Sequence, residues 1–168
     1  VNVEITDGSK DIMLFADSGK SIRFSEKDAR PMGRVSQGVR GMKIEKGQKV
    51  ISLLVLEEGN ILTATENGYG KQTKTSEFSI QKRGGKGKSG IKTRQEDSVV
   101  QTLSVSTHTA VLFFSTEGLV YKLKAWKIPE GTSVSKGKSL FNILPLKNHQ
   151  SISSIMPFPE DQTEWKNM

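Results

Sequence analysis

Hairpin-like segments recur in this chain about every 50 residues, and this repeat constrains the fold more than any other feature. Each segment has two short β-rich runs joined at a glycine, as in a β-hairpin. The segments cover residues 11–24, 60–73 and 109–123, and their turn glycines are Gly19, Gly68 and Gly118. The Asn67-Gly68 pair favours a tight type I′ turn, in which both central residues have positive φ.

A second glycine follows each turn glycine after 19 residues, at Gly38, Gly87 and Gly137. Two further β-rich runs then complete each unit. The third strands are predicted at 39–44, 88–93 and 138–143, and the fourth at 50–56, 99–105 and 152–158. Four strands in about 50 residues are typical of propeller-like blades, so we predict an all-β fold with Leu53 and Phe114 in its core.

The predicted repeat units are 11–58, 59–107 and 108–158. Residues 1–10 resemble the end of a preceding unit, and residues 163–168 stop where another first strand would begin. Three blades are fewer than a usual propeller ring contains. We therefore interpret residues 1–168 as a single domain that is a fragment of a larger array.

The charge balance favours a polyanionic partner. The chain has 25 Lys and Arg against 18 Asp and Glu, a formal net charge of +7. Nucleic acid is favoured over a membrane, because no basic amphipathic helix is evident and the longest apolar run, 50–56, is too short to span a bilayer. The absence of cysteine excludes disulfides and thiolate metal sites and fits the reducing cytoplasm.

Residues 81–90 read Gln-Lys-Arg-Gly-Gly-Lys-Gly-Lys-Ser-Gly, with four basic residues, four glycines and no acid. This composition disfavours both a helix and a buried segment, so we expect a surface loop. Its cations and its accessible N–H groups suit contacts with phosphates. The alternative interpretation is a solvated, flexible loop without a ligand.

Each unit carries a charged connector after its second strand, at 25–37, 74–86 and 124–136. Equivalent connectors of a repeat emerge at the same edge, so together they would form one basic stripe. In the alternative interpretation, acids such as Glu26, Asp28 and Glu130 cancel the stripe. The predicted DNA-binding residues are Gln81, Lys82, Arg83, Gly84, Gly85, Lys86, Gly87, Lys88, Lys92, Arg30, Arg34, Arg40, Lys43, Lys71, Lys122, Lys124, Lys127, Lys136 and Lys138.

The heptad 81–87 resembles the gyrase box found in the C-terminal domain of the DNA gyrase A subunit, with Lys82 where that family usually has Arg. The surrounding sequence is similar to blades of the same domain over essentially the whole chain. The matching segments are 30–34, 38–41, 67–71, 76–78, 112–124 and 128–130. One order differs: the family's box lies in the first blade, whereas here the 30–41 segment precedes it.

This resemblance implies a β-pinwheel, a propeller variant whose blades exchange strands with their neighbours. It also implies a basic rim that bends duplex DNA. In gyrase, an ATP-dependent type IIA topoisomerase, the box permits the wrap that leads to negative supercoiling. The implied partners are the rest of the gyrase A subunit and, through it, the gyrase B subunit. The related topoisomerase IV domain stays an alternative, although its box is usually degraded.

Catalytic, cofactor and metal sites are not expected. His108 and His149 lack partners at metal-ligand spacing, and the acid pairs 57–58 and 96–97 fit turns. No phosphate-binding loop or nucleophile motif is present. Two other binding functions remain open: a propeller-like module for an acidic protein, and an RNA-binding β protein. RNA binding would favour aromatics on an open sheet, but aromatics are 7% of the chain and lie mostly within strands.

Overall fold

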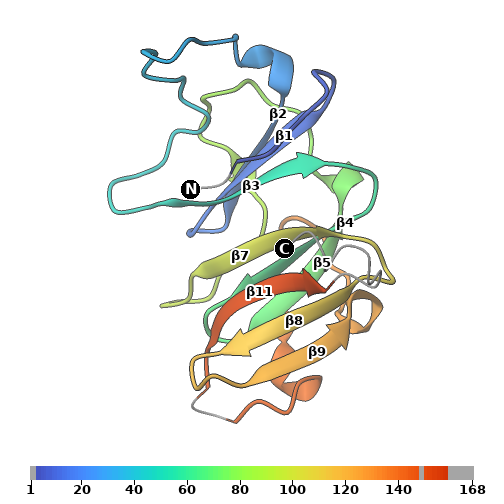
Figure 1. Ribbon diagram of the computed structural model, residues 1–168. Helices are drawn as coiled ribbons and strands as arrows, with labels where there is room; N and C mark the ends of the chain where they lie inside the picture. Colours follow the sequence, from blue (N-terminus) through green and yellow to red (C-terminus); the bar gives the residue numbers. More distant parts are fainter. Residues whose placement is uncertain (1–2, 148–149, 159–168) are drawn as a thin grey trace.

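The computed structural model describes residues 3–147 and 150–158, which form three antiparallel sheets stacked one after another (Figure 1). The strands are β1 (Asp11–Ala16), β2 (Lys20–Ser25), β3 (Val50–Leu56), β4 (Asn60–Thr65), β5 (Tyr69–Lys74), β6 (Lys88–Ser89), β7 (Val99–Val105), β8 (Ala110–Ser115), β9 (Val120–Lys124), β10 (Lys138–Ser139) and β11 (Ile152–Phe158). Short 3-10 turns are η1 (Glu26–Asp28), η2 (Thr75–Glu77), η3 (Ala125–Lys127) and η4 (Leu140–Asn142). Within the described ranges, no helix is long and apolar enough to cross a membrane.

Neighbouring units exchange strands. The sheet orders are β3-β1-β2-β6, β10-β5-β4-β7 and β11-β8-β9. Strand β6 belongs to the second unit but pairs with β2 of the first, and β10 of the third unit pairs with β5 of the second. The predicted all-β, pinwheel-like architecture is thus confirmed, with three strands rather than four in the described part of the last sheet.

The hairpin turn at Asn67-Gly68 differs from the predicted type I′ geometry, and the turns at Gly19 and Gly118 have the same form. The amide of Gly68 donates to the carbonyl of Thr65 at 3.1 Å, and Gly19 and Gly118 make the equivalent bonds. Each glycine has a φ near +80° (74° to 80°), whereas Asn67 is not among the residues with positive φ. In a three-residue hairpin loop such as residues 66–68, the left-handed conformation is confined to the glycine, which has no Cβ.

The predicted third strands are shorter than expected, and residues 39–44 form no strand. The physical reason is the exchange: β6 and β10 pair with a second strand of the preceding unit, and the described residues offer no such strand to 39–44. The amide of Lys43 donates instead to Gly85 O at 2.8 Å. Residues 3–10 likewise contain no strand, and 163–168 lie outside the described residues.

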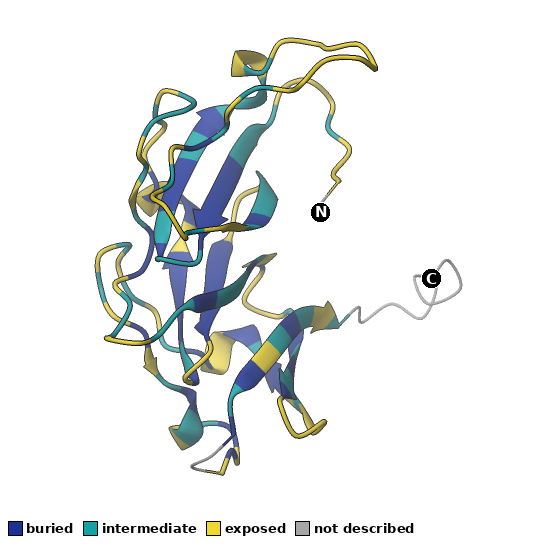
Figure 2. Ribbon diagram, turned by 90° about the vertical axis from the view of Figure 1, so that its left-hand side faces the viewer, coloured by how far each residue is buried: buried dark blue, intermediate teal, exposed yellow. Residues whose placement is uncertain are grey.

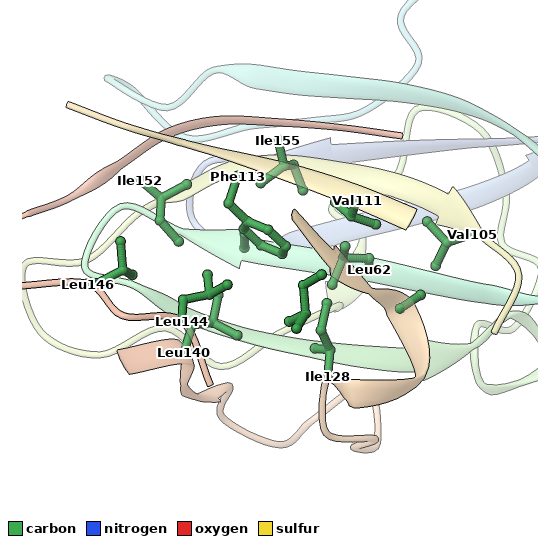
Figure 3. Packing of buried hydrophobic residues seen from close by; sticks show 13 residues of the cluster. Leu62, Val105, Val111, Phe113, Ile128, Leu140, Leu144, Leu146, Ile152 and Ile155 are labelled. Carbon is green, nitrogen blue, oxygen red and sulfur yellow. The ribbon is translucent and has the colours of Figure 1, made fainter. Parts of the chain in front are cut away.

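The largest apolar cluster joins the second and third sheets (Figure 3). Phe113 of β8 is fully buried there, packed among residues such as Leu62, Ile128 and Ile155. The predicted core residues Phe114 and Leu53 are only half-buried. In β8 the alternation of the strand turns Phe113 toward the cluster, so its neighbour Phe114 faces the other way.

Candidate nucleic-acid interface

In the structure the first connector is the whole segment between β2 and β3, residues 26–49, and the box loop, residues 81–87, packs on it. The amide of Gly84 donates to Gly41 O at 2.8 Å, and the amide of Lys43 donates to Gly85 O at the same distance. Arg83 adds two side-chain bonds, from Nε to Asp28 O at 2.8 Å and from Nη1 to Arg40 O at 2.7 Å. The guanidinium therefore ties two connectors together, and Arg83 is half-buried rather than freely exposed.

A glycine of the box allows close packing inside the molecule. Gly87 has a φ of +73°, and a Cβ there would lie 2.6 Å from Ser21 O and 2.7 Å from Cε of Met42. The sequence interpretation assigned the close approach of the backbone to an outside partner. At Gly87 the close neighbour is β2 of the adjacent unit.

The third connector is likewise the whole segment between β9 and β10, residues 125–137, and it lies against the segment that follows the box. The amide of Lys92 donates to Ser135 O at 3.2 Å, and Nη1 of Arg94 donates to Gly137 O at 3.1 Å. The same guanidinium lies 3.5 Å from the centre of the Tyr69 ring. The three connectors, with residues 88–94 between the second and the third, thus form one row, and exposed loops run beside the buried strands in Figure 2.

Most predicted DNA-binding residues on this row are exposed. We call these exposed cations the basic rim: Arg30, Arg34, Arg40, Lys43, Lys82, Lys86, Lys88, Lys92, Lys136 and Lys138. The Nζ of Lys88 donates to Ser79 Oγ at 2.9 Å. Gln81, Gly84, Gly85 and Gly87 are half-buried parts of the supporting backbone.

An acid close to the rim is already paired. The Nζ of Lys20 lies 2.6 Å from Oε1 of Glu45. This hydrogen bond and the charge of Lys20 hold the pKa of Glu45 below its ordinary value. Glu45 therefore stays ionised near neutral pH, and Lys20 offsets its charge.

The structure corrects the assignment of Lys71 as a direct DNA contact. Its exposed fraction is 1%, and it lies in the middle of β5. Its Nζ donates to the carbonyl oxygens of Thr132, Ser133 and Ser135 in the third connector. Because the ammonium is enclosed by these groups, it cannot reach a phosphate on the surface.

Lys122, Lys124 and Lys127 form a second basic group on β9 and η3. The Nζ of Lys122 lies 3.8 Å from the centre of the Phe158 ring, and Lys127 lies 5.4 Å from that of Trp126. Lys124 donates to His108 O at 3.1 Å. Lys122 and Lys124 lie on β9, which is separated from β11 by β8 in the third sheet, and Lys127 lies on η3 directly after β9.

Sequence reasoning missed two residues that couple successive units. Arg23 donates from Nη1 to the carbonyls of Thr75 and Phe78, at 3.2 and 3.0 Å. Gln72 occupies the equivalent position one unit later and donates from Nε2 to Ala125 O and Ile128 O. A polar residue at the same place in two consecutive second strands was the available signal.

No metal centre emerges within residues 3–147 and 150–158, where no cluster of three potential ligands occurs. His108 is exposed, and His149 lies outside the described residues. The interface thus consists of cations and backbone groups, which suit binding of an anionic polymer.

The fold and the basic row define a propeller-like β module with a cationic edge. Residues 10–57, 59–106 and 109–159 match the family described as DNA gyrase C-terminal domain, beta-propeller. The chain belongs to this family.

Several known proteins are similar to the chain. It is 40% identical over 163 residues to the DNA gyrase A subunit of Rickettsia bellii, covering 96% of the chain and 17% of the relative. For the same protein of Pseudomonas aeruginosa the identity is 37% over 141 residues, covering 83% and 15%. The chain thus spans less than a fifth of the length of these relatives.

Two solved structures share the fold. A DNA gyrase A C-terminal domain superposes with a TM-score of 0.79 at 27% identity, covering 90% of this chain and 51% of that one. A C-terminal domain of DNA topoisomerase IV superposes with a TM-score of 0.85 at 20% identity, covering 98% and 51%. The second likeness concerns the fold alone.

Proposed function

We propose that this chain is a non-catalytic module of a bacterial gyrase A subunit that binds and wraps duplex DNA in the cytoplasm. The observation that carries the proposal is the row of connectors bearing the basic rim. The rest of the A subunit and, through it, the B subunit are the proposed protein partners. The relatives of about 40% identity are gyrase A subunits, which favours gyrase over topoisomerase IV.

Binding should be independent of DNA sequence. Lysine and arginine side chains on loops contact phosphates without reading base edges. We assign residues 1–168 to one domain with units 11–58, 59–107 and 108–158. Each unit contributes one connector to the row, so a long duplex can contact all three.

Wrapping requires contacts at several points along the duplex. Bending 20–30 bp by 40–90° costs about 1–6 kcal/mol, which contacts with successive units must offset. The box loop is suited to one of these contacts because its backbone is fixed to the first connector on one side and to β2 on the other. Arg83 belongs to this support, whereas Lys82, Lys86 and Lys88 are exposed.

The test uses a triple variant, Lys82→Ala, Lys86→Ala and Lys88→Ala, which leaves Arg83 intact. Fluorescence energy transfer is measured between the ends of a duplex of about 40 bp, long enough to require bending. Wild type should bring the ends together, and the triple variant should bind a short duplex yet lose this signal on the long one.

The matched control removes three exposed lysines outside the predicted set, Lys27, Lys74 and Lys147. It should retain the end-to-end signal at saturation. If the box variant bends the duplex as wild type does, the box is not a wrapping contact. If an acidic protein or poly-glutamate competes as well as duplex DNA for wild type, the chain is a protein-interaction module instead.

A further inference from the structure

The third connector is built around a buried cation. Lys71 rises from β5 beneath residues 131–137, and its ammonium donates to three backbone carbonyls of that loop, two of them at 3.3 Å (Ser133) and 3.0 Å (Ser135). Ser135 N and Oγ also donate to Thr132 O, which closes the loop on itself. The loop therefore has a defined backbone although it contains few residues that pack in a core.

This arrangement determines where the N–H groups of the loop point. In a planar trans peptide the N–H is antiparallel to the C=O of the same unit. The carbonyls of residues 132, 133 and 135 point inward at Lys71, so the amides of Ser133, Val134 and Lys136 point outward. Within the described part of the chain, these three amides donate to no protein acceptor.

The buried charge strengthens the outward-facing donors. Each peptide dipole has its negative end on the ammonium and its positive end at the surface, and hydrogen bonding to a cation polarises the peptide further. Val134 and Lys136 are exposed, so the positive ends are accessible to a ligand. Positive potential thus reaches the surface through the backbone as well as through the side chain of Lys136.

The box loop produces positive potential at the surface in a different way. At the position equivalent to Lys71 the first unit has Ile22, whose Cδ1 lies 3.7 Å from where a Cβ of Gly85 would be. The box has no cation beneath it at this position and carries its charge on surface side chains. In the third connector, the charge of the buried Lys71 adds to that of the surface residue Lys136.

We propose that residues 132–136 form a binding surface for the phosphates of duplex DNA, built from the amides of Ser133, Val134 and Lys136 and the Lys136 side chain. Lys71 is the positioning residue of this surface. Because the three carbonyls converge on one ammonium, the three amides diverge. Divergent donors fit a row of phosphodiesters rather than one small anion. The proposal deepens the proposed function and rests on it.

The first test is a titration of the ¹⁵N-labelled 168-residue chain with a mixed-sequence duplex of about 20 bp, which needs little bending. We expect the amide signals of Ser133, Val134 and Lys136 to shift together with those of the box loop. Inorganic phosphate at the same phosphate concentration should leave them in place. Shifts in the box alone would overturn the inference and leave DNA binding intact, whereas no shift in either loop would contradict the proposed function itself. Equal or larger shifts with inorganic phosphate would mean that residues 132–136 bind small anions and are not a surface for duplex DNA.

The second test removes one donor. Val134→Pro deletes the amide hydrogen, and Val134→Ala is its matched control because it keeps the amide and also trims the side chain. We expect Val134→Pro to weaken duplex binding about threefold to tenfold relative to Val134→Ala, the range for one net hydrogen bond, without changing the salt dependence. Lys136→Ala should instead reduce the steepness of the salt dependence by about one phosphate. Equal affinity of the two Val134 variants would refute the role of the backbone.

The third test addresses Lys71. In Lys71→Met the aliphatic length is kept and the charge is lost, so the duplex-induced shifts of residues 133–136 should shrink while those of the box remain. Unchanged shifts at residues 133–136 would show that Lys71 does not position this surface. If this variant does not fold, the Val134 pair and the wild-type titration still decide the proposal.

Discussion

At Gly87 one missing side chain allows the box loop to pack against the neighbouring unit. An L-residue at its φ of +73° costs about 1–2 kcal/mol, and the Cβ would overlap Ser21 O and Met42 Cε. Overpacking of this kind typically adds about 1–3 kcal/mol.

We therefore expect Gly87→Ala to lower the free energy of unfolding by about 2–5 kcal/mol. Gly118→Ala is the control, because Gly118 has a similar φ of +79° but no atom within 4 Å of a Cβ. It should lose only the conformational part, about 1–2 kcal/mol. Urea unfolding of both variants measures the difference, and equal losses would mean that the contact with β2 does not matter.

Lys71 gives the chain a pH dependence that an exposed lysine would not. Burial lowers the pKa of Lys71 from 10.5 to about 8, and the carboxylate of Glu77 acts weakly in the opposite direction. The segments packed over it carry further charged residues, Glu130 and Lys136 on the connector and Lys138 on β10, and all three are exposed. Above pH 8 the ammonium that orients the loop is progressively lost.

Duplex affinity of wild type should accordingly fall more between about pH 7 and 9 than that of Lys71→Met, when ionic strength is held constant. The effect on stability has the opposite sign. Between about pH 8 and 10.5 the unfolded chain holds a proton that the folded chain has lost, so this group raises the free energy of unfolding as pH rises through that window. Identical pH profiles of DNA binding in the two proteins would rule out Lys71 as the titrating group.

At the scale of elements, the units are joined by short exchanged strands and by the side chains of Arg23 and Gln72. Each exchanged strand has only two residues. Gln72 therefore contributes more to the contact between units than a single polar residue normally would. Its side-chain amide donates to two carbonyls around η3, and its side-chain oxygen accepts from Asn60 Nδ2 at 3.1 Å. Arg23 makes the corresponding bonds around η2 and is held by Asp11, 2.7 Å away.

Gln72→Ala should destabilise the chain by about 1–3 kcal/mol, because the carbonyl of Ile128 loses its donor and the buried side-chain amide of Asn60 loses its acceptor. Amide hydrogen exchange should accelerate most around η3 and β10, where the second and third units meet. The exposed Gln95→Ala is the control and should stay within about 0.5 kcal/mol of wild type. Faster exchange spread evenly over all three sheets would contradict a local role in coupling the units.

For the whole molecule, the basic rim leads to a steep salt dependence of DNA binding. If about six phosphates are neutralised, the logarithm of the binding constant should fall with the logarithm of the salt concentration with a slope of about −5. Band-shift titrations at several salt concentrations, with duplexes of unrelated sequence, measure this slope. A salt-insensitive complex, or binding confined to one sequence, would contradict a phosphate-binding surface.

Local sequence signals were sufficient for much of the fold. The fourth strands lie at 50–56, 99–105 and 152–158 as predicted, and the hairpins turn at Gly19, Gly68 and Gly118. Strand-forming runs and a glycine that can adopt positive φ act within a few residues, so a sequence pattern can reveal them. The period of about 50 residues then indicated the repeat of blades.

Only the tertiary structure decided which segments meet across units. It placed β6 and β10 in the neighbouring sheets and buried Phe113 rather than Phe114. It also directed Arg83 to carbonyls of the first connector and enclosed Lys71 beneath the third. These outcomes depend on contacts between residues roughly 50 positions apart, one repeat period. A lysine in a strand has the same local pattern whether its ammonium meets water or three carbonyls, and the arrangement of the adjacent unit determines which of the two it meets.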